Sequence, residues 1–157
     1  MSRPYTGNKD LRDGPRPGTV RFMDYLVFLI GGSNRGIYAR RSVRGGKGTS
    51  VHQTGRALDY GGSLAQVRQA IEFTYRHREI FQVEEIHDYI GAWIPSKGFG
   101  AGYRCSRDRG GLFAGWKIYD KPTIGPGGRW THIELAPEIA DSPELVDQAM
   151  IAIFEKK

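Results

Sequence analysis

The sequence predicts an α+β fold, in which a small antiparallel sheet is flanked by helices and joined by long irregular loops. Some segments space their apolar residues at helical intervals, whereas others alternate apolar and polar residues as half-buried strands do. Glycine accounts for 22 of the 157 residues, about twice its usual share, which predicts long connections between short elements. A chain of this length suits one domain with one core.

The chain is expected to divide at residue 18. Residues 1–18 are expected to form an extended basic arm, because prolines and glycines interrupt them and charged residues stand between. The arm is polar and has no apolar core, so we do not expect it to be a secretory signal. Residues 19–157 are expected to fold as a single domain.

Helices are predicted in three places. Thr19 is a suitable N-cap for a helix over Val20–Ile30, whose apolar residues fall at helical spacing. Ser63 can cap a second helix over Leu64–His77, which has one apolar face. The run Ser142-Pro143-Glu144 combines a cap, a proline in the first turn and an acid, so it predicts the start of a closing helix.

Strands are predicted between and after these helices. Short extended segments are expected over residues 36–43 and 55–60. Alternation and β-branched residues indicate a strand over residues 83–90, and a turn then leads to a short partner strand over residues 92–94. A last strand is expected over Trp130–Leu135.

The composition limits the classes of partner. The net charge of +6 favours an anionic partner, such as nucleic acid, a membrane surface or a bacterial cell wall, without choosing among them. No apolar run reaches the roughly 18–20 residues that span a bilayer, so no membrane span is expected.

Residues 95–128, rich in glycine and arginine, are expected to be irregular. The sole cysteine, Cys105, cannot form an internal disulfide and is expected to be a small buried apolar residue.

The most informative stretch of the chain has the pattern S-x-H-x-x-G-x-A-x-D, which contains His52 and Asp59. A bend at Gly55, which accepts positive φ, can fold His52 back towards Asp59. His132 lies in the last predicted strand and completes the group if that strand neighbours the Asp59 strand. Two histidines and one aspartate are three ligands for a tetrahedral zinc and leave the fourth position to a water. The sequence therefore predicts zinc as the cofactor.

The stretch Ser50–Asp59 resembles the signature of the LAS-type zinc peptidases. These include D-Ala-D-Ala carboxypeptidases and dipeptidases, murein endopeptidases and many phage endolysin peptidase domains, and the Hedgehog signalling domain shares their fold. The resemblance implies a Hedgehog-like, D-Ala-D-Ala-peptidase-like domain over residues 19–157. It also implies that His52 and Asp59 are the first two zinc ligands and that His132 takes the place of the third.

The general base is left open by a departure from the family pattern. Where the H-x-H or E-x-x-H motif of the family has His or Glu, this chain has Trp130 and Arg129. Glu134 lies on the ligand face of the last strand, so we place it first as the base, and Glu85 second. Glu85 shares a strand face with His87, and the alternative for both is a solvated strand edge.

An arginine ahead of the motif is a further expectation from the resemblance. Such an arginine stabilises an oxyanion or binds a substrate carboxylate. Arg40 is our choice among Arg40, Arg41 and Arg44, and the alternative is that it is one of many surface arginines.

The resemblance, together with the positive charge, implies a zinc metallopeptidase that cleaves peptide bonds in peptidoglycan stem peptides or cross-links, as phage lysins do. Acting at the bacterial cell wall without a signal peptide, it would wait in the host cytoplasm before lysis or travel with the virion. The alternative is a non-catalytic, zinc-containing module of cell-wall binding or virion structure. A nucleic-acid binder that uses Arg104, Arg107, Arg109 and the basic N-terminal arm is ranked last, because charge alone supports it.

Overall fold

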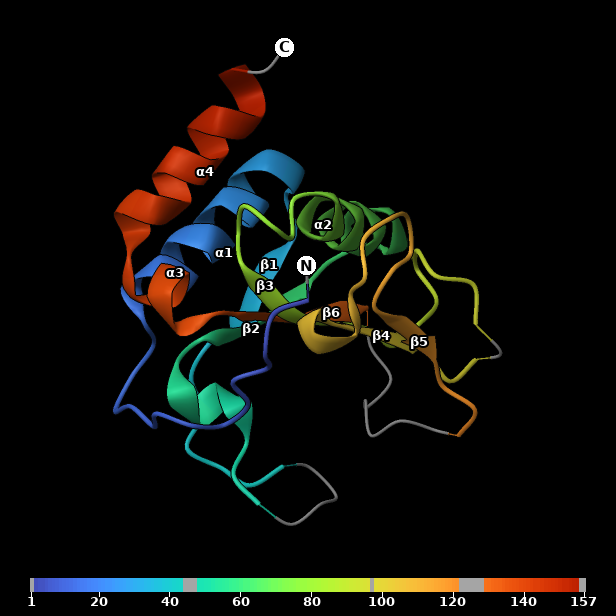
Figure 1. Cartoon of the computed structure of the whole chain (residues 1–157), viewed down its shortest axis with the longest axis horizontal. Helices are drawn as coiled ribbons and strands as arrows, with labels where there is room; N and C mark the ends of the chain where they lie inside the picture. Colours follow the sequence, from blue (N-terminus) through green and yellow to red (C-terminus); the bar gives the residue numbers. More distant parts are fainter. Residues whose placement is uncertain (1, 44–47, 97, 122–128, 156–157) are drawn as a thin grey trace.

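Six strands pair into one antiparallel sheet in the computed structural model, which describes residues 2–43, 48–96, 98–121 and 129–155. Their order across the sheet is β1-β2-β6-β3-β4-β5, so the last strand of the chain lies in the middle of the sheet (Figure 1). The predicted α+β class is confirmed. The strands are β1 (Ser33–Gly36), β2 (Ala57–Gly61), β3 (Val83–Asp88), β4 (Ala101–Arg104), β5 (Trp116–Ile118) and β6 (Trp130–Leu135).

Helices cover one face of this sheet (Figure 1). The first two helices contact the sheet, and the last helix packs against the first. The second helix begins at a capping box formed by Ser63 and Gln66, so the predicted helix over residues 64–77 is confirmed to within one residue. The helices are α1 (Pro17–Ile30), α2 (Leu64–Arg76), α3 (Pro137–Asp141) and α4 (Pro143–Glu155), with 3₁₀ turns η1 (Val51–Thr54) and η2 (Cys105–Arg107).

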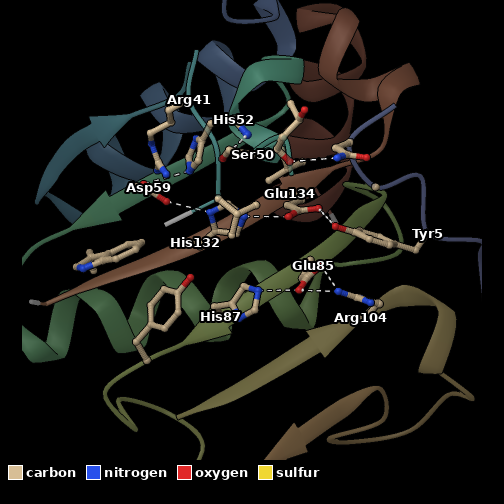
Figure 2. A pocket seen from close by; sticks show the side chains of 17 residues that line it. Tyr5, Arg41, Ser50, His52, Asp59, Glu85, His87, Arg104, His132 and Glu134 are labelled. Atoms are coloured by element: carbon tan, nitrogen blue, oxygen red, sulfur yellow. Dashed lines mark hydrogen bonds and ion pairs between the residues drawn. The ribbon is translucent and has the colours of Figure 1, made fainter. Parts of the chain in front are cut away.

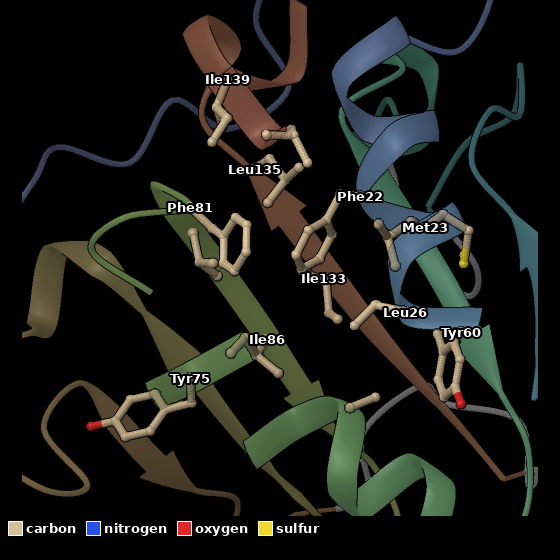
Figure 3. Packing of buried hydrophobic residues seen from close by; sticks show 14 of the residues in the cluster. Phe22, Met23, Leu26, Tyr60, Tyr75, Phe81, Ile86, Ile133, Leu135 and Ile139 are labelled. Atoms are coloured by element: carbon tan, nitrogen blue, oxygen red, sulfur yellow. The ribbon is translucent and has the colours of Figure 1, made fainter. Parts of the chain in front are cut away.

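Strand alternation gives the sheet an apolar face and a polar face. Leu58, Ile86 and Ile133, from β2, β3 and β6, are fully buried. Figure 3 shows Ile86 and Ile133 among the side chains of this core. They belong to the same cluster as Phe22 and Phe81, whose ring centroids are 4.8 Å apart. Because successive side chains point to opposite faces, the intervening residues of the three central strands lie on the polar face.

The first helix begins three residues earlier than predicted, at Pro17 instead of Val20. Proline at the first helical position gives up no helical hydrogen bond, because that N–H has no partner within the helix. Gly18 then lies against the backbone of α3, where a Cβ would overlap the carbonyl oxygen of Ile139. Pro17 and Gly18, which were among the residues that predicted an extended arm, therefore belong to a helix that approaches α3 closely.

The predicted strand over residues 36–43 is wrong. Strand β1 ends at Gly36, and the only strand-like pairing within residues 37–43 is the isolated bridge from Ser42 to Thr49. The backbone leaves the sheet at Ile37, whose carbonyl group accepts a hydrogen bond from His52 at 2.9 Å. This carbonyl is used to hold a side chain of the polar face and not to extend a ladder.

The predicted strand over residues 92–94 is also wrong, because this segment is a turn held by Asp88. The buried Asp88 carboxylate accepts hydrogen bonds from the backbone N–H groups of Ala92, Trp93 and Ile94, at 2.8 to 2.9 Å. The strand that pairs with β3 is instead β4, which lies within the segment expected to be irregular, as does β5. Residues 97 and 122–128 of that segment lie outside the described part of the chain.

Two smaller observations complete the fold. Cys105 is buried, 2% exposed, as expected for a small apolar residue. Within the described ranges, none of the helices combines the length and the hydrophobicity that crossing a bilayer requires.

Replacing Asp88 tests the turn. In Asp88→Ala, three backbone donors lose a charged acceptor, and we expect the free energy of unfolding to fall by about 2–4 kcal/mol in urea denaturation. Asp24→Ala, on the exposed side of α1, is the control and should change it by less than about 0.5 kcal/mol. Equal stability of the two variants would contradict the structural role of Asp88.

Candidate metal centre

Strand pairing places the predicted residues in one row across the polar face. In the antiparallel register, Asp59 of β2 lies opposite His132 of β6, and His132 lies opposite His87 of β3. Figure 2 shows these side chains side by side above the sheet. The last strand therefore neighbours the Asp59 strand, which was the condition for His132 to join the group.

His52 reaches the row from the turn η1, just before β2. The Ser50 hydroxyl caps this turn by accepting the backbone N–H of His52. The turn ends at Gly55, which has φ of 72°, in the left-handed region that favours glycine. The bend returns His52 to the sheet, where its Nε2 lies 3.2 Å from Asp59 Oδ2.

His52, Asp59 and His132 form a group that could hold a metal ion. One ligand atom from each residue lies within 4.8 Å of the others. Ligands at about 2.0–2.2 Å in a tetrahedron around zinc are about 3.5 Å apart, so a small contraction would fit the group to one ion. His52 and His132 are 5% and 6% exposed, so an ion bound between them would be largely shielded from solvent.

The hydrogen bonds of the two imidazoles turn their lone pairs inward. His52 Nδ1 faces the Ile37 carbonyl at 2.9 Å, and His132 Nε2 faces Glu134 Oε1 at 2.9 Å. Both partners only accept, so these nitrogens carry protons. The remaining nitrogens, Nε2 of His52 and Nδ1 of His132, therefore point unprotonated lone pairs at Asp59 when the rings are neutral. A metal ion between them would satisfy all three groups, and histidine ligands of metals are commonly held in this way.

The balance of buried charge also leaves room for a cation. Arg56 and Arg104, which lie near Glu134 and Glu85, have carboxylate partners of their own, each at 3.0 Å, in the pairs Arg56–Glu84 and Arg104–Glu85. Arg56 reaches Glu134 only at 3.9 Å. Asp59 and Glu134 therefore depend on imidazoles for compensation, and two carboxylates match the charge of one divalent ion.

A proton takes the place of this cation when the centre holds no metal. Burial alone would lower the pKa of His132, but hydrogen bonds to Asp59 and Glu134 raise it to about 10. Burial alone would raise the pKa of Asp59, but hydrogen bonds from His132 and His52 bring it well below its usual range. Metal and proton thus compete for the same nitrogen.

Glu134, the first choice as base, has both carboxylate oxygens engaged. Oε1 accepts from His132, and Oε2 accepts the phenol O–H of Tyr5 at 2.8 Å. The residue is 3% exposed. These contacts are those of a carboxylate that orients a histidine ligand.

Glu85, the second choice, is paired with His87 on the central strand β3. His87 Nε2 lies 2.6 Å from Glu85 Oε1, and the Arg104 guanidinium donates to both Glu85 oxygens. Burial alone would raise the pKa of Glu85, but the hydrogen bond from His87 and the charges of His87 and Arg104 lower it to about 2. Because β3 lies between β6 and β4, the pair is not at a solvated strand edge.

The row continues beyond His87 through a tyrosine that the sequence did not indicate. Tyr119 places its hydroxyl 3.1 Å from His87 Nδ1. It lies over Gly102, the residue opposite His87 on β4, where a Cβ would overlap the tyrosine hydroxyl. The glycine opposite a strand histidine is the signal that could have pointed to this contact.

A cavity of about 410 Å³ opens over the row. Arg41 lines it, whereas Arg40 does not: Arg40 is paired with the exposed Asp13 at 3.0 Å, and its side chain is 70% exposed. Arg40, the arginine expected from the sequence, therefore does not lie at the site, whereas its neighbour Arg41 does. The lining residues are Tyr5, Gly7, Asn8, Arg41, Val43, Thr49, Ser50, Val51, His52, Asp59, Glu85, His87, Tyr89, Arg104, Trp130, His132 and Glu134.

Comparisons with known proteins identified no relative of this chain. No protein-family model matches the chain, and searches of curated proteins and of solved structures found no significant match.

The stability of the metal-free protein should depend on pH through this site. The raised pKa of His132 stabilises the fold fully below its ordinary value of about 6.5, and this contribution is lost as pH rises towards about 10. The lowered pKa of Asp59 acts oppositely, since its contribution is lost as pH falls below its ordinary value of about 4. Urea denaturation in chelator should therefore show falling stability from about pH 6 to 10, with a weaker slope in His132→Gln. An identical slope in both proteins would contradict this account.

Proposed function

We propose that His52, Asp59 and His132 hold a zinc ion and that the protein is a zinc-dependent peptidase. The observation that carries the proposal is the pair of imidazoles whose outer nitrogens are bound by acceptors and whose inner nitrogens converge on one carboxylate beneath a cavity. Imidazole ligands favour zinc over calcium or magnesium, which take oxygen ligands. Three protein ligands are typical of catalytic zinc, which keeps one position for water or substrate.

Zinc at this position would polarise a substrate carbonyl and make a bound water more acidic. The residues around it would orient the ligands and bind the substrate. Glu134 holds the Nε2 proton of His132 and so fixes the ring that binds the metal. Arg41 lies on the cavity wall, in a position to bind a substrate carboxylate or an oxyanion, the role that the sequence assigned to Arg40.

Proton transfer is best assigned to the pair Glu85 and His87. His87 faces His132 across the strand pair, with ring centroids 5.5 Å apart, and it lines the cavity. Its Nε2 proton is shared with Glu85 Oε1 at 2.6 Å, so the pair can take up a proton and return it to a leaving amine. This assignment reverses the sequence preference for Glu134, because Glu134 orients the ligand His132, whereas Glu85 is paired with a histidine outside the ligand group.

Peptidoglycan is the substrate that we propose, cut in its stem peptides or cross-links, with the protein acting as a phage lysin at the bacterial cell wall. The support is the resemblance of Ser50–Asp59 to the LAS-type signature, together with the net charge of +6. A Hedgehog-like arrangement of the sheet is part of the same proposal. Arg41 and Arg104 on the cavity wall suit a substrate with carboxylates.

One observation favours the alternative of a non-catalytic zinc module. The family positions for a base beside the third ligand hold Arg129 and Trp130, and Glu134 is engaged with His132 and Tyr5. The alternative predicts full zinc occupancy without turnover of purified peptidoglycan, whereas measurable cleavage excludes it.

Loss of a ligand should remove zinc and activity together. In His52→Ala and Asp59→Ala we expect zinc content, measured by mass spectrometry, to fall to background, and release of new amino groups from peptidoglycan to cease. His77→Ala is the matched histidine control, because His77 lies at the end of α2, away from the site, and both readouts should match the original protein. Continued cleavage by a zinc-free variant would refute the mechanism.

The two carboxylates should separate by phenotype. Glu85→Gln should keep zinc and lower kcat by about 10²–10⁴-fold, because it removes a proton-transfer partner. Glu134→Gln should weaken zinc binding by about 10–100-fold, because it removes the negative charge of the carboxylate that accepts the proton of a ligand histidine. Kinetics at saturating zinc and chelator competition measure the two effects. The opposite pattern would return Glu134 to the role of base.

A further inference from the structure

The N-terminal arm runs alongside the sheet and the turn η1 (Figure 1). Its contact with Glu134 through Tyr5 brings it to the candidate metal centre. Arg12 N–H donates to the carbonyl of Gln53, and Arg16 N–H donates to that of Gly55, so the arm binds the turn that carries His52. The side chain of Arg16, 2% exposed, also donates to the Thr54 carbonyl at 2.7 Å. The arm is therefore bound to the domain at this turn.

The absence of a side chain at Gly55 of the sequence motif allows the N-terminal arm to pass close to it. A Cβ at Gly55 would overlap the carbonyl oxygen of Gly14 and crowd the backbone of Arg16. The glycine thus serves two purposes, since it permits the left-handed bend after His52 and leaves space for the arm.

Tyr5 is the arm residue that enters the site. Its phenol donates to Glu134 Oε2 at 2.8 Å, and the other oxygen of Glu134 accepts from His132 at 2.9 Å (Figure 2). The Arg104 guanidinium lies over the Tyr5 ring, 4.2 Å from its centroid, and is itself bound to Glu85. The ring is held from one side by a cation and at its hydroxyl by a carboxylate.

We propose that Tyr5 is a positioning residue of the metal centre, acting through Glu134 on His132. Without the phenol, Glu134 Oε2 loses its hydrogen bond, and Arg56 lies 3.9 Å from it, so the carboxylate is held less firmly against the ring that it orients. The inference rests on the proposed zinc site and assigns to the N-terminal arm a part in building it. The arm is then a component of the centre, and its displacement weakens metal binding.

The next residue along the arm provides an internal control. Thr6 binds Glu84 through its backbone N–H at 3.1 Å and its hydroxyl at 2.6 Å. Glu84 is the partner of the fully buried Arg56, which also donates to the carbonyl of Gly7. Thr6 thus anchors the arm without touching Glu134, so its removal separates general docking of the arm from the specific contact of Tyr5.

The test compares Tyr5→Phe with two matched variants of the full chain. Tyr5→Phe keeps the ring under Arg104 and deletes one hydrogen bond, and we expect the zinc Kd, measured by chelator competition at neutral pH, to rise by about tenfold. Thr6→Val deletes an arm contact to Glu84, and Tyr25→Phe deletes a phenol–carboxylate hydrogen bond to Asp147, 2.7 Å long and far from the site. Both should leave the zinc Kd unchanged even where they lower stability.

Two further measurements separate positioning from stability. The double variant Tyr5→Phe/Glu134→Gln should bind zinc only slightly more weakly than Glu134→Gln alone. Both substitutions disrupt the same chain of hydrogen bonds, from Tyr5 through Glu134 to His132. The ¹⁵N resonance of His132 Nε2 in the metal-free protein should shift in Tyr5→Phe and not in Thr6→Val. Unchanged zinc affinity in Tyr5→Phe, or an equal loss in Thr6→Val, would overturn the inference. Failure of the original protein to bind zinc at all would instead overturn the proposed function.

Discussion

The antiparallel pairing of β2 with β6, in the register that sets Asp59 opposite His132, is the constraint on which the rest of the site depends. Side chains alternate between faces, so a slip of one residue would bury these polar groups among the helices and expose Leu58 and Ile133. The burial of those two apolar residues therefore fixes the register, and the register in turn brings a carboxylate to an imidazole. Core packing on one face thus specifies the chemistry of the other.

Much of the site could be predicted because its signals are local. Alternation predicts the strand over residues 130–135, and the face shared by His132 and Glu134 follows from it. The cap and the apolar stripe predict the helix after Ser63. The approach of His52 to Asp59 follows from a glycine between them that permits a left-handed bend.

The missed features are those set by contacts distant in sequence. Tyr5 and Glu134 are 129 positions apart, and no periodicity marks the tyrosine as a partner. Strands β4 and β5 are only four and three residues long, too short for alternation to stand out in a glycine-rich segment. The choice between Arg40 and Arg41 depended on which way irregular backbone turns its side chains, and residue spacing holds no such information.

Gly102 has a consequence for how the centre can vary. Strand β4 offers bare backbone at the position beside His87, and Tyr119, from just beyond β5, fills the space. The group that faces His87 Nδ1 is thus supplied from outside the three central strands. A substitution at position 119 can therefore change the hydrogen bond to His87 Nδ1 without changing the pairing of the strands that carry the other site residues.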